Sequence, residues 1–152
     1  MLIKIDTREQ LPYSFIIPSE VGTLPIGDYS ISGLEHNISI ERKTLDDLVG
    51  CLTQQRKRFE RELFRGKALD YFTLVVEGSL SDIQMRKYFS KTPSEAVIQS
   101  LLAFSVRYRL PVFFCENRKF GERVTESLLC KFAREIEKQG KALTQQNESH
   151  RR

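Results

Sequence analysis

Two acidic residues and a lysine stand near the start of the sequence, at Asp28, Glu41 and Lys43. Residues 38–43 read Ile-Ser-Ile-Glu-Arg-Lys, and β-branched residues at alternate positions favour a strand. Side chains alternate between the faces of a strand, so Glu41 and Lys43 share one face and Arg42 points away. Asp28 follows a Pro-Ile-Gly turn signal and opens a second short strand. Carboxylates at 28 and 41 would form an oxygen site for Mg²⁺ or Mn²⁺, and Lys43 could orient or activate an attacking water, as in a metal-dependent phosphodiesterase.

Each of these residues also has an ordinary structural interpretation. Asp28 could be a turn residue, and Glu41 and Lys43 a solvent-facing pair. Asp47 could be a first-turn acid near a helix N-terminus. The full order is more restrictive than any one residue. A Gly-Asp-Tyr turn precedes a strand carrying Glu-Arg-Lys, and an aspartate follows the lysine by four residues.

This order closely resembles the nuclease motif of the XPF-type structure-specific DNA endonucleases. Residues 3–9 (Ile-Lys-Ile-Asp-Thr-Arg-Glu) also resemble that family's first strand and its Asp-x-Arg-Glu signature. Residues 48–52 (Leu-Val-Gly-Cys-Leu) match the start of the helix after the motif. The specific part of the resemblance covers residues 3–52, and beyond it only the order of strands and helices agrees, to about residue 137.

The resemblance implies hydrolysis of one DNA strand near a branch, a flap or a duplex–single-strand junction, in repair or recombination. We expect Asp28 and Glu41 to bind one or two divalent cations, with Asp47 or Asp6 completing or supporting the shell. Lys43 would position the water or neutralise charge in the transition state.

Three further residues belong to this hypothesis. Arg42 cannot easily reach the same phosphate from the opposite strand face, and could pair with Asp46 or Asp47 or contact DNA from the side. The resemblance implies that Arg8 and Glu9 join the same polar cluster, although an Arg-Glu pair at a strand end is often simply exposed.

Positive charge gathers directly downstream of these residues. Between residues 54 and 67 six cations face only Glu60 and Glu62. The cations are Arg56, Lys57, Arg58, Arg61, Arg65 and Lys67. Phosphate contact is one interpretation, and a solvated helix face with i,i+4 ion pairs is the other. The apolar stripe thins from Gln54, so we expect the helix that begins after Thr44 to leave the core there and run along the surface.

Composition limits the class of protein. With 152 residues, 40% of them hydrophobic and 29% charged, the chain fits one globular domain, and no apolar run is long enough to span a membrane. The net charge of +4 favours a polyanionic partner. Three widely spaced cysteines indicate reduced thiols in an intracellular protein, in the cytoplasm or nucleoid if prokaryotic. With only two histidines, a zinc hydrolase, a His-based nuclease or a Ser-His-Asp triad has little to be built from.

The elements that must position the site follow from periodicity. We expect strands near residues 2–6, 28–33, 37–43, 71–77 and 111–115, and helices from Thr44, near 80–88, from Thr92 and over 120–138. Residues 10–27 hold three prolines and two glycines and predict an irregular loop. Glu77, at a strand end, is expected to be a surface acid. Gly140 would end the last helix, and residues 141–152 would form a polar, disordered tail.

This order predicts an α/β fold, a three-layer sandwich with a central mixed β-sheet flanked by helices. It agrees with the restriction-endonuclease-like fold of the XPF family, which periodicity alone could not have named. We expect one nuclease domain over residues 1–140.

The expected partner is DNA, in branched form if the resemblance holds. Many relatives carry a tandem helix-hairpin-helix module or a helicase that this chain has no room for, so we expect a homodimer or a partner subunit to help select the junction. Phe113, Phe114, Phe132 and Ile136 are candidates for such a contact and equally for the core. The main alternative is a non-catalytic DNA-binding scaffold that pairs with an active nuclease subunit, although the intact acids and lysine argue against it. A general nuclease or a restriction enzyme on the same fold is a second alternative.

Overall fold

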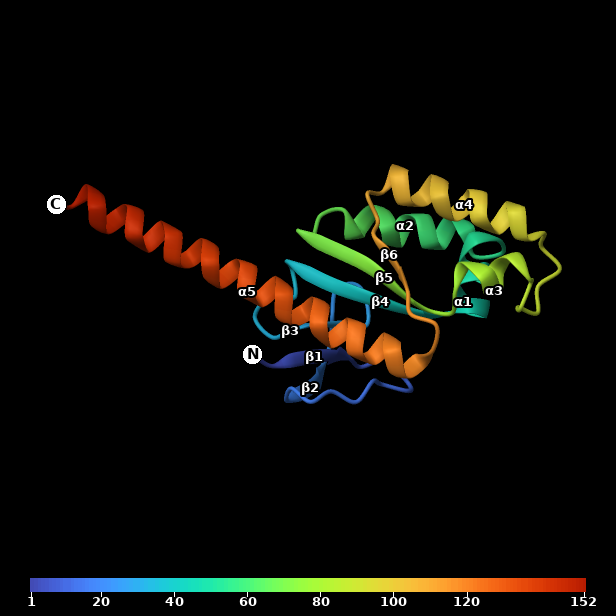
Figure 1. Cartoon of the computed structure of the whole chain (residues 1–152), viewed down its shortest axis with the longest axis horizontal. Helices are drawn as coiled ribbons and strands as arrows, with labels where there is room; N and C mark the ends of the chain where they lie inside the picture. The colour runs from blue at the N-terminus through green and yellow to red at the C-terminus, as the bar shows by residue number, and fades with distance from the viewer.

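A six-stranded sheet with helices on both faces forms the body of the molecule in the computed structural model, which describes residues 1–152 (Figure 1). The strands are β1 (Ile3–Asp6), β2 (Ser19–Gly22), β3 (Tyr29–Ile31), β4 (Ile38–Thr44), β5 (Tyr71–Glu77) and β6 (Val112–Phe114). The helices are α1 (Leu45–Leu52), α2 (Arg56–Gly66), α3 (Leu80–Gln84), α4 (Ser94–Arg107) and α5 (Arg118–His150). None of these helices combines the length and apolar character needed to cross a membrane.

The sheet is mixed, with strand order β2-β1-β3-β4-β5-β6. β1 and β2 are parallel, β3 runs antiparallel to both of its neighbours, and β4, β5 and β6 are parallel to one another. Helices α1 to α4 lie on one side of the sheet and α5 crosses the other (Figure 1). The predicted α/β sandwich with a central mixed sheet is therefore confirmed.

Each face of the sheet has its own hydrophobic core. Leu48, Leu74 and Phe104 belong to the core between the sheet and the helices α1 to α4. Ile3, Tyr29 and Leu129 belong to the core between the sheet and α5. Burial on both faces explains why β5 is a nearly continuous apolar run, as is usual for a strand with parallel neighbours.

Helix α1 begins directly after the Glu-Arg-Lys strand, at a capping box. The Thr44 side chain accepts a hydrogen bond from the Asp47 N–H, and the Asp47 carboxylate accepts one from the Thr44 N–H, as the predicted cap requires. The single helix expected from here is in fact two, because the chain turns between Leu52 and Arg56. The second helix also does not leave the core, since Phe59 and Leu63 are each only 1% exposed.

Two other expectations were wrong. The proline-containing segment 10–27 includes β2, which pairs with β1 through backbone groups that its side chains do not reveal. The last helix does not end at Gly140 but continues to His150, so residues 141–150 do not form the expected disordered tail. A single glycine costs a helix only about 1 kcal/mol, and most residues around Gly140 are good helix formers.

Candidate active site

The turn before β3 fixes the position of Asp28. Gly27 adopts a positive φ of 78°, and a side chain there would clash with Ser39 and approach the Ile40 carbonyl. The Asp28 N–H donates to the Ile40 carbonyl at 2.9 Å, and the Asp28 carbonyl accepts from the Asp6 N–H at 2.9 Å. Asp28 is thereby held between β1 and β4.

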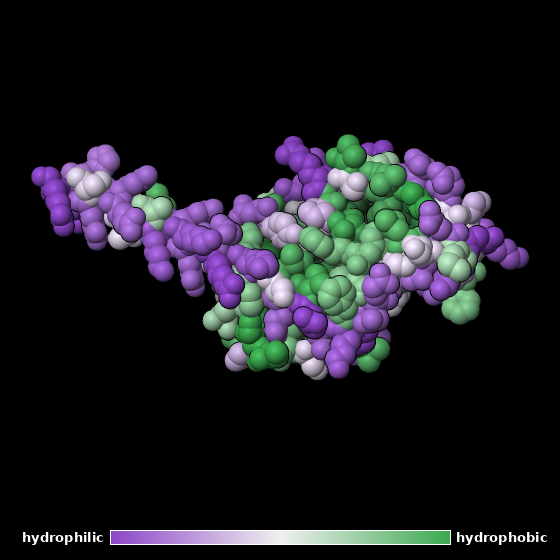
Figure 2. Space-filling view, in the orientation of Figure 1, coloured by the Kyte–Doolittle hydropathy of each residue, from purple (hydrophilic) through white to green (hydrophobic).

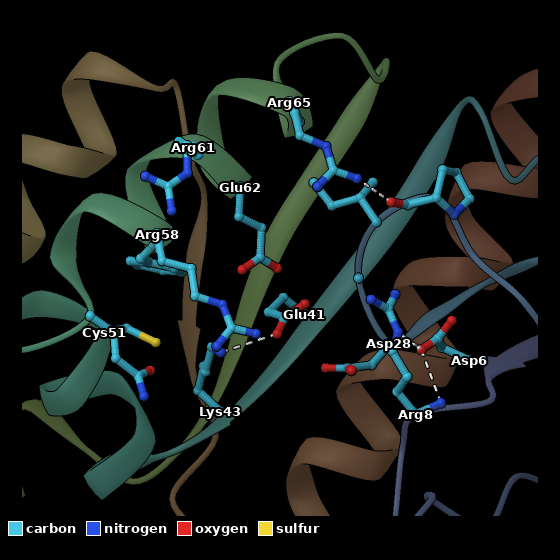
Figure 3. Close-up of a pocket in the computed structure, with 15 residues that line it drawn as sticks. Asp6, Arg8, Asp28, Glu41, Lys43, Cys51, Arg58, Arg61, Glu62 and Arg65 are labelled. Atoms are coloured by element: carbon cyan, nitrogen blue, oxygen red, sulfur yellow. Dashed lines mark hydrogen bonds and ion pairs between the residues drawn. The ribbon is translucent and has the colours of Figure 1, made fainter.

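Strand β4 brings Glu41 and Lys43 to the same place. Their side chains share a face of the strand, and the Lys43 Nζ lies 3.1 Å from the Glu41 Oε1. The Arg42 N–H donates to the Asp28 Oδ2 at 2.8 Å, which ties the turn carboxylate to β4. The three residues with which the sequence argument began are therefore neighbours (Figure 3).

These residues line a cavity of about 350 Å³ between the turn, β4 and the helices α1 and α2. Figure 3 shows carboxylates and guanidinium groups from opposite sides converging on it. Its charged lining residues are Asp6, Arg8, Asp28, Glu41, Lys43, Arg58, Arg61, Glu62 and Arg65. A pocket with acids at its base and arginines along its side can hold a cation and a phosphate side by side.

The acids at the base of the pocket are costly as anions. Burial raises the pKa of Asp28 to about 7, although the Arg42 N–H opposes this rise. Burial also raises the pKa of Glu41 well above its ordinary value, and repulsion from Asp28 and Glu62 adds to it. Burial opposes the charged form of Lys43, but attraction to Glu41 outweighs it, so the pKa of Lys43 is raised and the amine stays protonated at neutral pH.

Two lining residues were not among the predicted site residues. Glu62 extends from α2 toward Glu41, and Cys51 on α1 lies beside Lys43 (Figure 3). Burial raises the pKa of the Cys51 thiol, so it is a neutral neighbour in the pocket. The helical spacing of Glu62 from Arg58 could have placed the two on one face, but which face meets the pocket depends on packing.

Arg42 lies on the other face of β4, outside the pocket. Its Nε donates to Glu77 at 3.1 Å and its Nη1 to Glu9 at 3.1 Å. The hydroxyl of Tyr13 donates to the same Glu77 carboxylate at 2.8 Å, and the hydroxyl of Tyr29 donates to Glu9 at 3.1 Å. Three predictions are corrected: Glu77 is not a surface acid, Arg42 does not pair with Asp46 or Asp47, and Glu9 supports β4 from behind.

Asp6 is at the edge of the pocket, but its oxygens are already occupied. It accepts from the Arg8 Nε at 2.7 Å and from the Leu24 N–H at 2.9 Å. Burial opposes its ionisation, but these hydrogen bonds outweigh that effect and keep the pKa of Asp6 below its ordinary value. Asp6 therefore holds Arg8 at the pocket, where the Arg8 side chain is 70% exposed, and is poorly placed to be a metal ligand.

The remaining predicted residues separate into two groups. Arg58, Arg61 and Arg65 line the pocket, as expected for a basic helix beside the site. Asp47 is occupied in the α1 cap and does not line it. Arg56 packs between α2 and α4, where its Nη1 donates to Ser100 at 2.8 Å and its guanidinium covers Phe104. Lys57 is exposed outside the pocket.

The acids of the pocket determine how a divalent cation could be held there. No three acidic, cysteine or histidine side chains are close enough together to hold a metal ion by themselves. Asp28 and Glu41 nevertheless supply two carboxylates whose mutual repulsion a cation would relieve. Mg²⁺ commonly binds through one or two carboxylates and keeps several waters, so these residues fit that ion.

The family model for the ERCC4 domain matches residues 5–128. The chain belongs to the ERCC4 domain family. The match spans most of the sequence, including every residue of the pocket, and the resemblance to XPF-type nuclease domains is thereby confirmed.

Solved structures show the same fold. XPF from Aeropyrum pernix is 23% identical, with a TM-score of 0.68 over 85% of this chain and 60% of that one. A structure of the same archaeal protein in complex with DNA is 21% identical, with a TM-score of 0.70 over 88% of this chain and 65% of that one. This ERCC4 domain chain thus spans less than two thirds of the length of the XPF chains it matches. Comparison with curated proteins gives no match.

Proposed function

We propose that this chain is a divalent-metal-dependent DNA endonuclease that hydrolyses phosphodiester bonds, at branched, flap or fork DNA in repair or recombination. One observation carries the proposal. Two carboxylates that are costly as anions, Asp28 and Glu41, lie beside a protonated Lys43 at the base of a pocket with arginines along its side. Support for DNA as the partner comes from the family and from the archaeal XPF structure in complex with DNA.

Asp28 and Glu41 would hold Mg²⁺ or Mn²⁺, which when bound supplies neutralisation of charge on the scissile phosphate and eases deprotonation of the attacking water. Lys43 is protonated and paired with Glu41, so it acts as a hydrogen-bond donor and a positive charge toward the reacting phosphate. A general-base role for Lys43 does not fit its raised pKa.

The arginines of the pocket position the DNA backbone. Arg58 and Arg61 extend from α2 and Arg8 from the end of β1, so a strand lying over Asp28 would meet positive charge on both sides. Arg65 donates to the Pro25 carbonyl and so links α2 to the turn that carries Asp28. Guanidinium groups in such positions bind phosphates without reading sequence.

Cleavage of matched flap, fork, linear duplex and single-stranded DNAs with Mg²⁺ or Mn²⁺ tests the proposal. We expect metal-dependent cutting of the branched forms, lost in Asp28→Asn and Lys43→Ala, with DNA binding retained. Asp47→Asn is the matched control, because Asp47 lies outside the pocket, and it should cut normally. Binding without cutting under every condition would place the chain among non-catalytic scaffolds. Equal cutting of linear duplex would indicate a general nuclease.

The same proposal includes a second subunit, either another copy of this chain or a related one. Figure 2 shows a broad hydrophobic area on the face where Figure 1 draws β6 and α4. Leu102, Val106 and Phe113 are exposed large hydrophobics on these elements, and β6 is an edge strand. Phe114, Phe132 and Ile136 are only partly buried. Sedimentation across a range of protein concentrations tests for self-association, and a monomer at all concentrations would require a different partner.

A further inference from the structure

The connection between α3 and α4 carries an aromatic side chain in an unusual position. Phe89 is 95% exposed, and the neighbouring Met85 is 67% exposed. Single exposed apolar residues are common on proteins, so exposure alone says little. Phe89, however, projects from a loop whose other parts are firmly attached to the body of the protein.

Three attachments hold this loop. Tyr88, the residue before the exposed phenylalanine, is buried, and its hydroxyl donates to the Thr92 carbonyl at 2.6 Å. The N–H of Phe89 donates to the Asp46 Oδ1 at 2.9 Å, which fixes the loop to the first turn of α1. The Ser90 hydroxyl accepts from the Thr92 N–H at 3.1 Å. With one ring turned inward and the next held outward, Phe89 is presented at little entropic cost.

The charge around Phe89 is all of one sign. Arg86, Lys87 and Lys91 lie within five residues of one another, and no acid occurs between Gln84 and Ser94. Arg86 and Lys91 have no ion-pair partner, and Lys87 has only a 3.5 Å contact with the exposed side of Asp82. Figure 2 shows apolar side chains protruding among hydrophilic ones at the end of the molecule where Figure 1 draws this connection. An exposed ring flanked by unpaired cations is the surface that an unpaired nucleotide fits, because the base stacks while its phosphates meet positive charge.

The loop is also near the proposed site of cleavage. Asp46, to which Phe89 is bonded, is the third residue after Lys43. Standard backbone and side-chain lengths then limit the separation of the Lys43 and Phe89 Cα atoms to no more than about 20 Å. That is roughly the span of six nucleotides along one strand.

We propose that Phe89 stacks against an unpaired base of a DNA strand whose phosphates contact Arg86 and Lys91. This inference rests on the proposed function, because it assumes DNA as the substrate, and it assigns to this chain a site for the single-stranded part of a junction. A protein partner is less consistent with the loop, because three cations surround a small apolar surface with no acid among them.

The chain contains no tryptophan, so Phe89→Trp introduces a single fluorescent reporter at the proposed site. We would titrate it with a fork that has two single-stranded arms and with a fully paired duplex of equal length, in EDTA so that nothing is cut. We expect the fork to quench the emission of the introduced indole and the duplex to leave it unchanged. Val106→Trp, at an 80% exposed position on α4, is the control that neither DNA should quench.

Affinity provides a second measurement. Loss of one base–aromatic stack costs about 1–3 kcal/mol, so Phe89→Ala should weaken fork binding about fivefold or more and leave duplex binding unchanged. Phe89→Leu, which is apolar without a planar ring, should weaken it as well, whereas Phe89→Tyr should not. Val106→Ala should bind both DNAs like the wild type.

Unchanged emission with the fork, or normal fork binding by Phe89→Ala, would overturn the inference, as would a change in sedimentation without a change in DNA affinity. If the wild type still cuts branched DNA in that case, only the stacking site fails. Conversely, quenching by the fork in a protein that never cuts would leave the stacking site standing and remove the proposed catalysis.

Discussion

Asp28 shows at the scale of one residue that the site is built at the expense of stability. Its pKa is raised to about 7 by burial, against an ordinary value of 3.8. Between those two pH values the folded protein binds a proton that the unfolded chain does not. Stability must therefore fall as pH rises through this range, and the full cost remains above it. Glu41 contributes in the same direction, because its pKa is raised as well.

Asp28→Asn should therefore stabilise the metal-free protein at pH 8 by about 1–3 kcal/mol and change its stability little near pH 4, where the carboxyl is already protonated. The asparagine oxygen can still accept from the Arg42 N–H, so the turn should stay in place. Urea unfolding in EDTA at the two pH values measures the difference. A variant less stable than the wild type at pH 8 would show that the carboxylate is not under strain.

Arg42 illustrates which residue-scale assignments could be made from the sequence. Alternation along a strand correctly separated Arg42 from Glu41 and Lys43. Its partners could not be found in that way, because Glu77 lies 35 residues away on another strand. In the parallel register Arg42 is opposite Val75, so Arg42, Val75 and Glu77 share the face that packs toward α5. A pairing of this kind depends on which strands become neighbours, and periodicity within one strand does not contain that information.

At the scale of elements, the turn into β3 determines where Asp28 lies, and two glycines allow a matched comparison. Gly27 and Gly33 both have positive φ, at 78° and 90°. A side chain at Gly33 would meet nothing within 4 Å, whereas one at Gly27 would clash with Ser39 and crowd the Ile40 carbonyl.

Gly33→Ala should therefore cost about 1–2 kcal/mol of unfolding free energy, the cost of a left-handed backbone alone. Gly27→Ala should cost clearly more and should also reduce cutting, because it shifts the turn that carries Asp28. Urea unfolding of both variants, together with a cleavage assay, separates the two effects. Equal destabilisation of the two variants would mean that the contact with Ser39 does not position the turn.

Helix α2 contains two kinds of arginine that the sequence could not distinguish. Arg58 and Arg61 line the pocket, while Arg56 is folded against Ser100 and Phe104. Arg58→Ala and Arg61→Ala should each reduce the slope of log affinity against log salt by about 1 when DNA binding is measured across salt concentrations. Arg56→Ala should leave the slope unchanged and lower the unfolding free energy instead. The opposite result for either kind would contradict the proposed DNA path.

At the scale of the whole molecule, the α/β class and most strands followed from the sequence, because β4 and β5 have strong local patterns. What could not be predicted depends on packing between distant segments. Strand β2 carries exposed side chains and is held by backbone pairing with β1. Helix α2 was expected to leave the core because its apolar residues are few, yet Phe59 and Leu63 are enough to bury one face. That burial is what directs Glu62 and three arginines toward the pocket.

The far half of α5 extends beyond the body of the molecule (Figure 1), where residues 137–150 are all exposed. The near half holds the helix on the sheet through Gly121, Thr125 and Leu129, which are buried. A chain ending at Lys138 should therefore keep its unfolding free energy within about 0.5 kcal/mol, whereas one ending at Ser127 should lose Leu129 and fail to fold stably.

Urea unfolding at several protein concentrations measures both effects of this truncation. The helix in isolation is too polar to stabilise itself by packing, so if the shorter deletion proved destabilising, the lost contacts would have to come from outside the chain. A destabilisation that grows with protein concentration would identify the outer half of α5 as a contact between two copies. An unchanged free energy at every concentration would restrict any second subunit to the sheet edge at β6 and the near half of α5, where Phe113, Phe132 and Ile136 lie.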